Sequence, residues 1–135
     1  ESPYEYQAKL PPALSVPFDI SIPLARMTEA VGRLRQGLKG RWPNAIAVVF
    51  GHIADSNIHL SFRLPGGAQK DYGEVCDAVY GVVGAVGGSI SAEHGIGRMK
   101  RPYLKLSRSE AELDLMRRIK TALDPKGILN PGRVL

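Results

Sequence analysis

Two strand-like segments lie on either side of a short polar turn, and their spacing constrains the fold more than any other feature of the sequence. Residues 45–53 (AIAVVFGHI) are nearly all apolar, which is typical of a strand buried on both faces. Residues 58–64 (IHLSFRL) also have the composition of a strand. Because so few residues separate the two segments, they are predicted to pair as an antiparallel hairpin. The rest of the fold has to be built around this hairpin.

Segments of strand and helix periodicity alternate around the hairpin. Residues 16–23 (VPFDISIP) have the alternation of a half-buried strand. Its apolar side consists of Val16, Phe18, Ile20 and Ile22. Apolar residues recur at helical spacing over residues 24–40 and again over 70–88, whereas residues 89–104 look irregular. This interleaving predicts an α+β fold, an antiparallel sheet with helices packed on one face in a ferredoxin-like arrangement.

A third helix is predicted over residues 107–125. Ser107 and Glu110 have the spacing of a capping box at its start. The helix carries an apolar stripe that is predicted to be buried, formed by Leu113, Met116, Ile119 and Leu123. The remaining residues, 126–135, contain turn signals and are expected to form a loop.

The composition is that of a globular protein with one domain. The 135 residues are enough to bury a core, and the 44% hydrophobic and 23% charged residues are ordinary proportions. No apolar run approaches the roughly 20 residues of a membrane-spanning helix. The N-terminus has no signal-peptide pattern, and without an initiator Met the chain is expected to be a piece of a longer one. Cys76 is the single cysteine, so nothing indicates an oxidising compartment, and a cytoplasmic location is expected.

Positive charge gathers in one short segment, residues 98–105 (RMKRPYLK). The formal net charge of the chain is +5, and the charge outside this segment is dispersed. The segment contains four cations, Arg98, Lys100, Arg101 and Lys105. A solvated surface or a site for a small anionic substrate is therefore favoured over a nucleic-acid interface.

Two of the three histidines, His52 and His59, lie on either side of the hairpin turn. If Asp55 and Ser56 form a two-residue turn, His52 and His59 are directly opposed on one face, with Cβ atoms about 4.5–5.5 Å apart. Two imidazoles at that distance can chelate one ion. A shift of the register by one residue would separate them. On spacing alone, two ordinary polar residues beside a turn are the favoured interpretation.

The third histidine strengthens the metal-site interpretation, because Glu93 and His94 are neighbours in the glycine-rich segment SAEHGIG. Two histidines and one carboxylate form a metal site that leaves coordination positions open for a substrate. Adjacent residues rarely point the same way, so Glu93 can complete the metal site while His94 faces the substrate as a general base. The alternative for Glu93 and His94 is a pair that stabilises the loop by hydrogen bonds.

Three motifs together resemble a known family. GHIADSNIHL, GSISAEHGIG and LDPKGILNPGRVL occur in the order and spacing of the C-terminal domain of FAD-linked 2-hydroxy-acid dehydrogenases. This family includes D-lactate and D-2-hydroxyglutarate dehydrogenases and the flavin subunit of glycolate oxidase. The resemblance implies that residues 1–135 are a C-terminal substrate or cap domain, and that an FAD-binding domain of the vanillyl-alcohol-oxidase type precedes them. The opening Glu1-Ser2 is similar to the family's Arg-Glu-Ser stretch, whose arginine holds a substrate carboxylate.

The resemblance also implies roles for individual residues. His52, His59 and Glu93 match the ligands of a divalent metal, usually zinc or manganese, and His94 matches the catalytic base. Three residues are candidates for contact with the substrate: Asn57, Ser61 and Lys100. Asn130 is the candidate for contact with the flavin. Two departures concern substrate contacts: the family often has a lysine just before Asp19, where this chain has Pro17 and Phe18, and an asparagine where it has Ser61.

The implied reaction is the oxidation of a small anionic D-2-hydroxy acid to a 2-keto acid, with FAD as the hydride acceptor. The electron acceptor of the flavin is not identified by the sequence, and a homodimer is one assembly compatible with it. Two alternatives from other classes stay open. A metal-dependent hydrolase would use the same ligands without flavin, and a non-catalytic ligand-binding domain would keep the histidines for structure alone.

Overall fold

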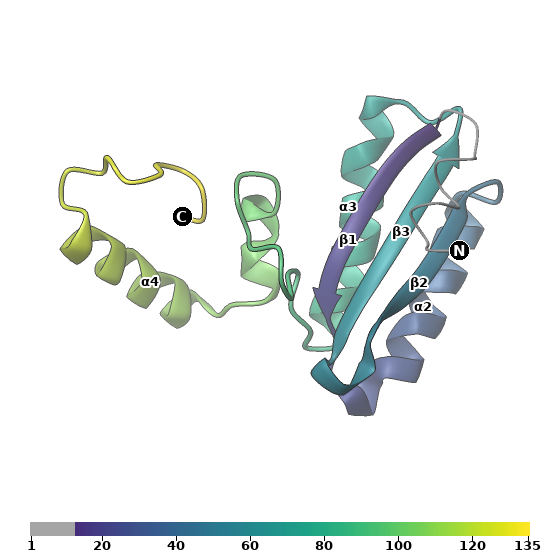
Figure 1. The fold of residues 1–135 in the computed structure, drawn as a ribbon, viewed down its shortest axis with the longest axis horizontal. Helices are drawn as coiled ribbons and strands as arrows, with labels where there is room; N and C mark the ends of the chain where they lie inside the picture. Colours follow the sequence, from purple (N-terminus) through teal and green to yellow (C-terminus); the bar gives the residue numbers. More distant parts are fainter. Residues whose placement is uncertain (1–12) are drawn as a thin grey trace.

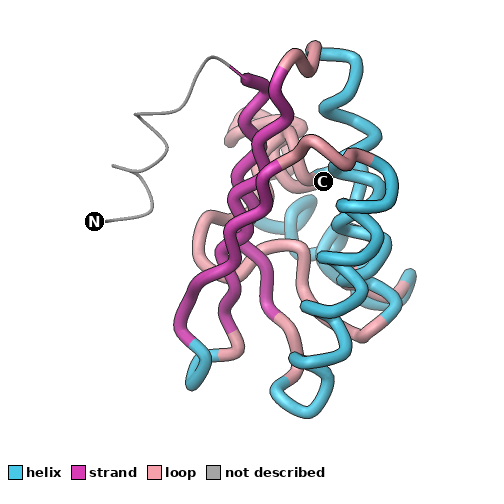
Figure 2. Tube along the Cα trace, turned by 90° about the vertical axis from the view of Figure 1, so that its right-hand side faces the viewer, coloured by secondary structure: helices cyan, strands magenta, loops and turns pink. Residues whose placement is uncertain are grey.

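The computed structural model describes residues 13–135, which form a three-stranded antiparallel sheet and three α-helices. The strands are β1 (Ala13–Ser21), β2 (Ile46–His52) and β3 (Asn57–Pro65), in the spatial order β1-β3-β2. Two helices, α2 (Met27–Arg41) and α3 (Gln69–Ala85), cover one face of this sheet (Figures 1 and 2). The predicted α+β fold with helices on one face is therefore confirmed. The Glu1-Ser2 match lies outside the described residues.

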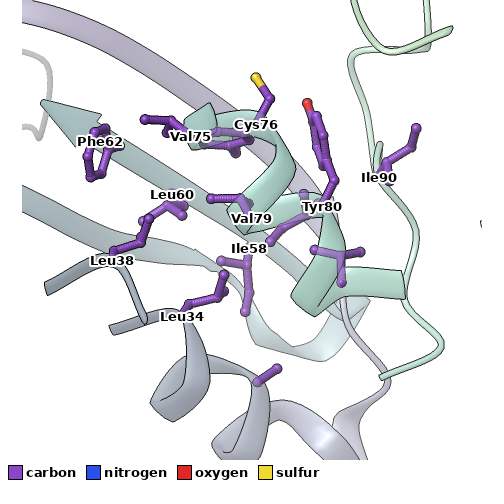
Figure 3. Close-up of a cluster of buried hydrophobic side chains, with 14 of the residues drawn as sticks. Leu34, Leu38, Ile58, Leu60, Phe62, Val75, Cys76, Val79, Tyr80 and Ile90 are labelled. Atoms are coloured by element: carbon purple, nitrogen blue, oxygen red, sulfur yellow. The ribbon is translucent and has the colours of Figure 1, made fainter. Parts of the chain in front are cut away.

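The core lies between the sheet and the two helices. Alternate residues of each strand point toward the helices, because successive side chains of a strand face opposite sides. From the sheet the core receives Val16, Phe18, Ile20, Ile58, Leu60 and Phe62, all at most 5% exposed. From the helices it receives Ala30, Leu34, Leu38, Val75, Val79 and Val83 (Figure 3). The alternation in β1 is the one that the sequence pattern predicts.

The order of elements resembles a ferredoxin-like fold that stops short of its last strand. A β-α-β-β-α sequence with the strand order 1-3-2 is the arrangement of that fold without the fourth strand. After α3, the chain makes one isolated antiparallel bridge, between Ser89 and Ser21 at the outer edge of β1. Beyond this bridge, the described residues form no further strand.

The structure corrects two predictions for the hairpin. β2 is an edge strand with no fully buried residue, because β3 takes the central position. The turn contains a 3-10 segment, Ile53–Asp55, followed by Ser56 in the left-handed region, so His52 pairs with Asn57 and not with His59. Gly51 allows the strands to approach here, since a Cβ at this position would lie 2.3 Å from the backbone oxygen of Asn57. The shift is two residues, so His52 and His59 still share a face.

The C-terminal part also differs from expectation. A 3-10 helix, Arg101–Leu106, occupies part of the segment predicted to be irregular, and α4 spans Glu110–Leu123. Its capping box is formed by Ser109 and Glu112, whereas Ser107 accepts a hydrogen bond from the Ile90 amide at 3.0 Å. The predicted buried stripe is mostly exposed: Leu113 is 5% exposed, Ile119 51% and Leu123 78%.

The stripe is exposed because α4 stands away from the sheet and its two covering helices (Figure 1). In the described residues, no helix is long and apolar enough to span a membrane.

Candidate functional site

The candidate site lies on the face of the sheet that the helices leave open. The residues that alternate with the core residues point to this face, and they include Asp19 of β1 and His59 of β3, which are directly opposed. Phe50 of β2 is opposed to His59 from the other side. A loop over residues 91–94 lies at β1 on this face, because its backbone amides bond to the Asp19 carboxylate. The hairpin and the loop therefore meet above the central strand.

The structure brings together the three predicted metal ligands. One nitrogen from each of His52 and His59 and one oxygen of Glu93 lie within 4.8 Å of one another. The two imidazole rings are perpendicular, with centroids 5.8 Å apart. Asn57 donates a hydrogen bond of 2.6 Å to Glu93 Oε1 and so helps to orient this carboxylate. Two histidines and one carboxylate converging in this way match the donor set of an open metal site.

Asp19 is a component of the site that the sequence analysis did not assign. It is 1% exposed, and its Oδ2 accepts hydrogen bonds from three successive amides, those of Ala92 (3.1 Å), Glu93 (2.8 Å) and His94 (2.8 Å). The available signal was a single carboxylate in an otherwise apolar strand, VPFDISIP, at a position that alternates with the core residues. A charged residue there needs partners from elsewhere in the chain.

The surroundings of Asp19 keep it ionised. Burial alone would raise its pKa, but the hydrogen bonds from the amides of His94 and Glu93 and the electrostatic interactions with His94 and Lys100 outweigh that effect. The pKa of Asp19 is therefore held below its ordinary value. A carboxylate that stays charged can hold the loop at any pH near neutrality.

Lys100 faces this interior network. Its side chain is 14% exposed, and its Nζ donates to Ser91 Oγ at 2.9 Å and to the Asp19 backbone oxygen at 3.3 Å. Burial lowers the pKa of Lys100 more than the neighbouring Asp19 raises it. Lys100 thus lies among the groups that hold the 91–94 loop, and a contact with substrate stays a prediction.

His94 and Ser61 border a small hollow beside the ligand cluster. The His94 ring is exposed and stacks on His59 with a centroid distance of 6.0 Å. The hollow has a volume of about 40 Å³ and is lined by Pro17, Phe18, Phe50, His59, Leu60, Ser61 and His94. Such a volume accommodates a few water-sized groups. Most of its walls are apolar, with one hydroxyl and two imidazoles as polar groups.

Asn130 belongs to a separate part of the molecule. It lies in the C-terminal turn with a φ of 49° and borders a crevice of about 170 Å³ formed by Lys120 and residues near the C-terminus. Buried Asp124 holds this turn by accepting hydrogen bonds from the amides of Ile128 (3.0 Å) and Leu129 (2.9 Å) and from Lys120. The structure therefore does not bring Asn130 to the histidines.

A metal ion fits the residues that the hairpin and the loop present. Besides the three converging ligands, two buried side-chain oxygens, Asp19 Oδ1 and Asn57 Oδ1, have no hydrogen-bond donor among the described residues. Both belong to residues that touch the cluster. Buried polar atoms without partners are rare in native structures, and a bound ion or water is one of the explanations for them.

Comparisons with known proteins identify the family of the chain. Residues 10–134 match the family described as FAD linked oxidases, C-terminal domain. The chain is 38% identical over 121 residues to a D-2-hydroxyglutarate dehydrogenase of Stutzerimonas stutzeri, an alignment that covers 86% of this chain and 26% of that protein. It is 41% identical over 119 residues to the mitochondrial D-2-hydroxyglutarate dehydrogenase of Bos taurus, covering 87% of this chain and 21% of that protein. The chain thus spans about a quarter of the length of the curated relatives it matches.

Proposed function

The chain belongs to the family of C-terminal domains of FAD-linked oxidases, and on this premise we propose that it is the substrate domain of a flavin-dependent D-2-hydroxy-acid dehydrogenase. Residues 1–135 would form the substrate or cap domain, and FAD would be bound mainly by a domain outside this chain. The product would be the 2-keto acid. The observation that carries the proposal is the cluster of His52, His59 and Glu93 on the open face of the sheet.

The three clustered side chains would hold a divalent cation, zinc or manganese. When bound, the cation would supply Lewis-acid stabilisation of the charge that develops on the substrate hydroxyl oxygen. Within the cluster, the His59 imidazole is partly buried, whereas His52 and Glu93 are exposed on the side that would face the substrate. Asn57 restricts the Glu93 carboxylate, so the cluster is organised before any substrate arrives.

His94 would act as the general base. Its exposed ring lies at the hollow, next to the ligand cluster, and it would accept the hydroxyl proton of the substrate on a ring nitrogen. The substrate's α-hydrogen would leave with its electron pair as hydride, for which a bound flavin would supply the acceptor. The loss of one proton and one hydride converts the alcohol carbon into a ketone and balances the reaction.

We assign the hollow to substrate binding. Ser61 would donate its hydroxyl hydrogen to a substrate oxygen, and Asn57 would contact substrate from the opposite side of His59. The relatives compared above are named for D-2-hydroxyglutarate, so this acid is the first to test, followed by D-lactate and glycolate. Asn130 would approach the flavin through the C-terminal turn.

Assembly and location are further expectations. The protein would transfer electrons from the flavin to an acceptor that is still to be identified, and it would form a homodimer. A cytoplasmic location is expected for this chain, whereas the bovine and Arabidopsis thaliana relatives are named as mitochondrial.

The test uses the full-length protein from which this chain derives. We expect it to contain FAD and one divalent metal ion per chain by elemental analysis, and to oxidise D-2-hydroxyglutarate with an artificial electron acceptor. Glu93→Gln should remove the metal and the activity, because the neutral amide is a poor ligand. Asp55→Asn is the matched control: it makes the same chemical change in the hairpin turn, outside the cluster, and should leave both unchanged.

Two results would contradict the proposal. Full turnover in a metal-free Glu93→Gln protein would show that the cluster has no catalytic role. Metal-dependent hydrolysis by a protein without flavin would favour the hydrolase alternative.

A further inference from the structure

We propose that Asp19 is a positioning residue for the metal cluster, with one carboxylate oxygen fixing the Glu93 loop and the other orienting the His59 imidazole. The inference rests on the proposed function, because it assumes that His52, His59 and Glu93 hold a metal. It adds a residue outside the ligand set that determines whether two of the three ligands converge.

The first oxygen acts on the loop. Asp19 Oδ2 accepts the amides of Ala92, Glu93 and His94, and it lies 3.3 Å from the Ser91 hydroxyl. Three successive amides that point at one anion hold the backbone in a concave turn. The backbone of Glu93 is therefore fixed above β1, and its side chain is directed toward β3, where Asn57 meets it.

The second oxygen faces His59. Asp19 Oδ1 is buried and has no hydrogen-bond donor among the described residues, yet His59 Nδ1 lies 3.9 Å away. That distance is too long for a hydrogen bond, and a small rotation of the imidazole would close it. Asp19 and His59 are directly opposed in the β1–β3 register, so the backbone already holds the two groups side by side.

A hydrogen bond between these groups would determine how His59 binds a metal. An imidazole that donates its Nδ1–H to a carboxylate presents the lone pair of Nε2 as the ligand. Phe50 packs on the His59 ring with a centroid distance of 5.2 Å and limits its rotation from the other side. Lys100 lies 3.7 Å from Asp19 Oδ2, which leaves Oδ1 as the oxygen available to His59.

The experiment is the substitution Asp19→Asn in the full-length protein. The asparagine oxygen can still accept the loop amides, but its NH₂ group would then face His59 Nδ1 and favour the tautomer that carries the proton on Nε2. We expect the zinc dissociation constant to rise by about 10- to 100-fold, measured by competition with a chromogenic chelator. In metal-free protein with ¹⁵N-labelled histidine, the His59 signals should change from the Nδ1–H to the Nε2–H tautomer. Loss of the signals in His59→Gln identifies them.

Asp124→Asn is the matched control. Asp124 is also a buried carboxylate that caps successive amides beside a lysine, but it lies in the C-terminal turn. Its substitution should change neither the zinc affinity nor the His59 tautomer. The control therefore separates a general effect of replacing a buried carboxylate from the effect of Asp19 on His59.

The outcomes separate the two proposals. A wild-type protein that binds no metal contradicts the proposed function. A folded Asp19→Asn protein with wild-type zinc affinity overturns the role of Asp19 and leaves the metal site intact. If Asp19→Asn does not fold, the tautomer in metal-free wild-type protein decides: Nδ1–H on His59 supports the inference, and Nε2–H refutes it.

Discussion

The two faces of the sheet are built from the same three strands, but only the open face contains buried side-chain oxygens that lack a hydrogen-bond donor among the described residues. On the helix-covered face, the side chains of β1 and β3 are apolar and almost fully buried, and Phe62 is 0% exposed. On the open face, the alternate positions carry Asp19, Asn57 and His59. The two buried side-chain oxygens without a donor in residues 13–135 both belong to this face.

This difference separates stability from function within a single sheet. The covered face gains its free energy from burial of apolar surface, whereas the open face holds charged and polar groups that are costly to bury unless a ligand or partner meets them. A substitution on one face should therefore change one property and leave the other nearly intact. Three predictions test this separation, beginning with the largest effect.

The largest effect is expected on the open face, from His94→Ala in the full-length protein. Removal of a general base typically lowers turnover by about 10²- to 10⁴-fold. Because the His94 side chain is exposed and is not one of the three proposed ligands, the metal content and the melting temperature should stay at wild-type values. Steady-state kinetics and elemental analysis measure the two properties, and an unchanged turnover would refute the assignment of the base.

A large effect of the opposite kind is expected on the covered face, from Phe62→Ala. Phe62 is fully buried and packs edge-on against Trp42 with a centroid distance of 5.5 Å. Its truncation should lower the free energy of unfolding by about 3–5 kcal/mol in urea denaturation. Ser15→Ala, at an exposed position of the open face, is the control and should stay within about 0.5 kcal/mol of wild type. Equal losses in the two variants would contradict the difference between the faces.

The smallest effect is a pH dependence that arises from Asp19. Its pKa in the folded protein is below the ordinary 3.8 because the amide hydrogen bonds and the electrostatic interactions with His94 and Lys100 outweigh the effect of burial. The ionised group therefore stabilises the fold at pH values above the unfolded pKa, and this contribution is lost as the pH falls through the folded pKa. The difference in unfolding free energy between wild type and Asp19→Asn should thus shrink as the pH falls from about 5 to 3, with a chelator present. A difference that stays constant over this range would show that the charge of Asp19 does not stabilise the fold.

The sequence predicted those parts of the fold that depend on local periodicity. The alternation in residues 16–23 and the helical spacing in 24–40 and 70–88 correspond to β1, α2 and α3. The position of each strand in the sheet was harder to predict, because an apolar segment such as β2 has the same sequence pattern whether it is a central strand or an edge strand. The helical periodicity of α4 likewise predicts an apolar stripe, and not what covers it.

The candidate site was predictable as a set of residues but not as a geometry. His52 and His59 share a face as expected, although the predicted pairing was wrong by two residues, because the turn is longer than Asp55-Ser56. Asp19 was missed because its partners lie more than 70 residues further along the chain. No local pattern connects a carboxylate in β1 with the amides of residues 92–94.

The single bridge between Ser21 and Ser89 has a consequence for redesign of this domain. A segment that continued to pair with β1 beyond Ser89 would complete the ferredoxin-like sheet, but it would keep Glu93 on the far side of β1. Two strand spacings, about 10 Å, would then separate its backbone from β3 and His59. The chain instead leaves the edge after Ser89, and the amides of residues 92–94 bond to the Asp19 carboxylate on the open face. Residues 89–94 can therefore either extend the sheet or bring Glu93 to the cluster, and they cannot do both.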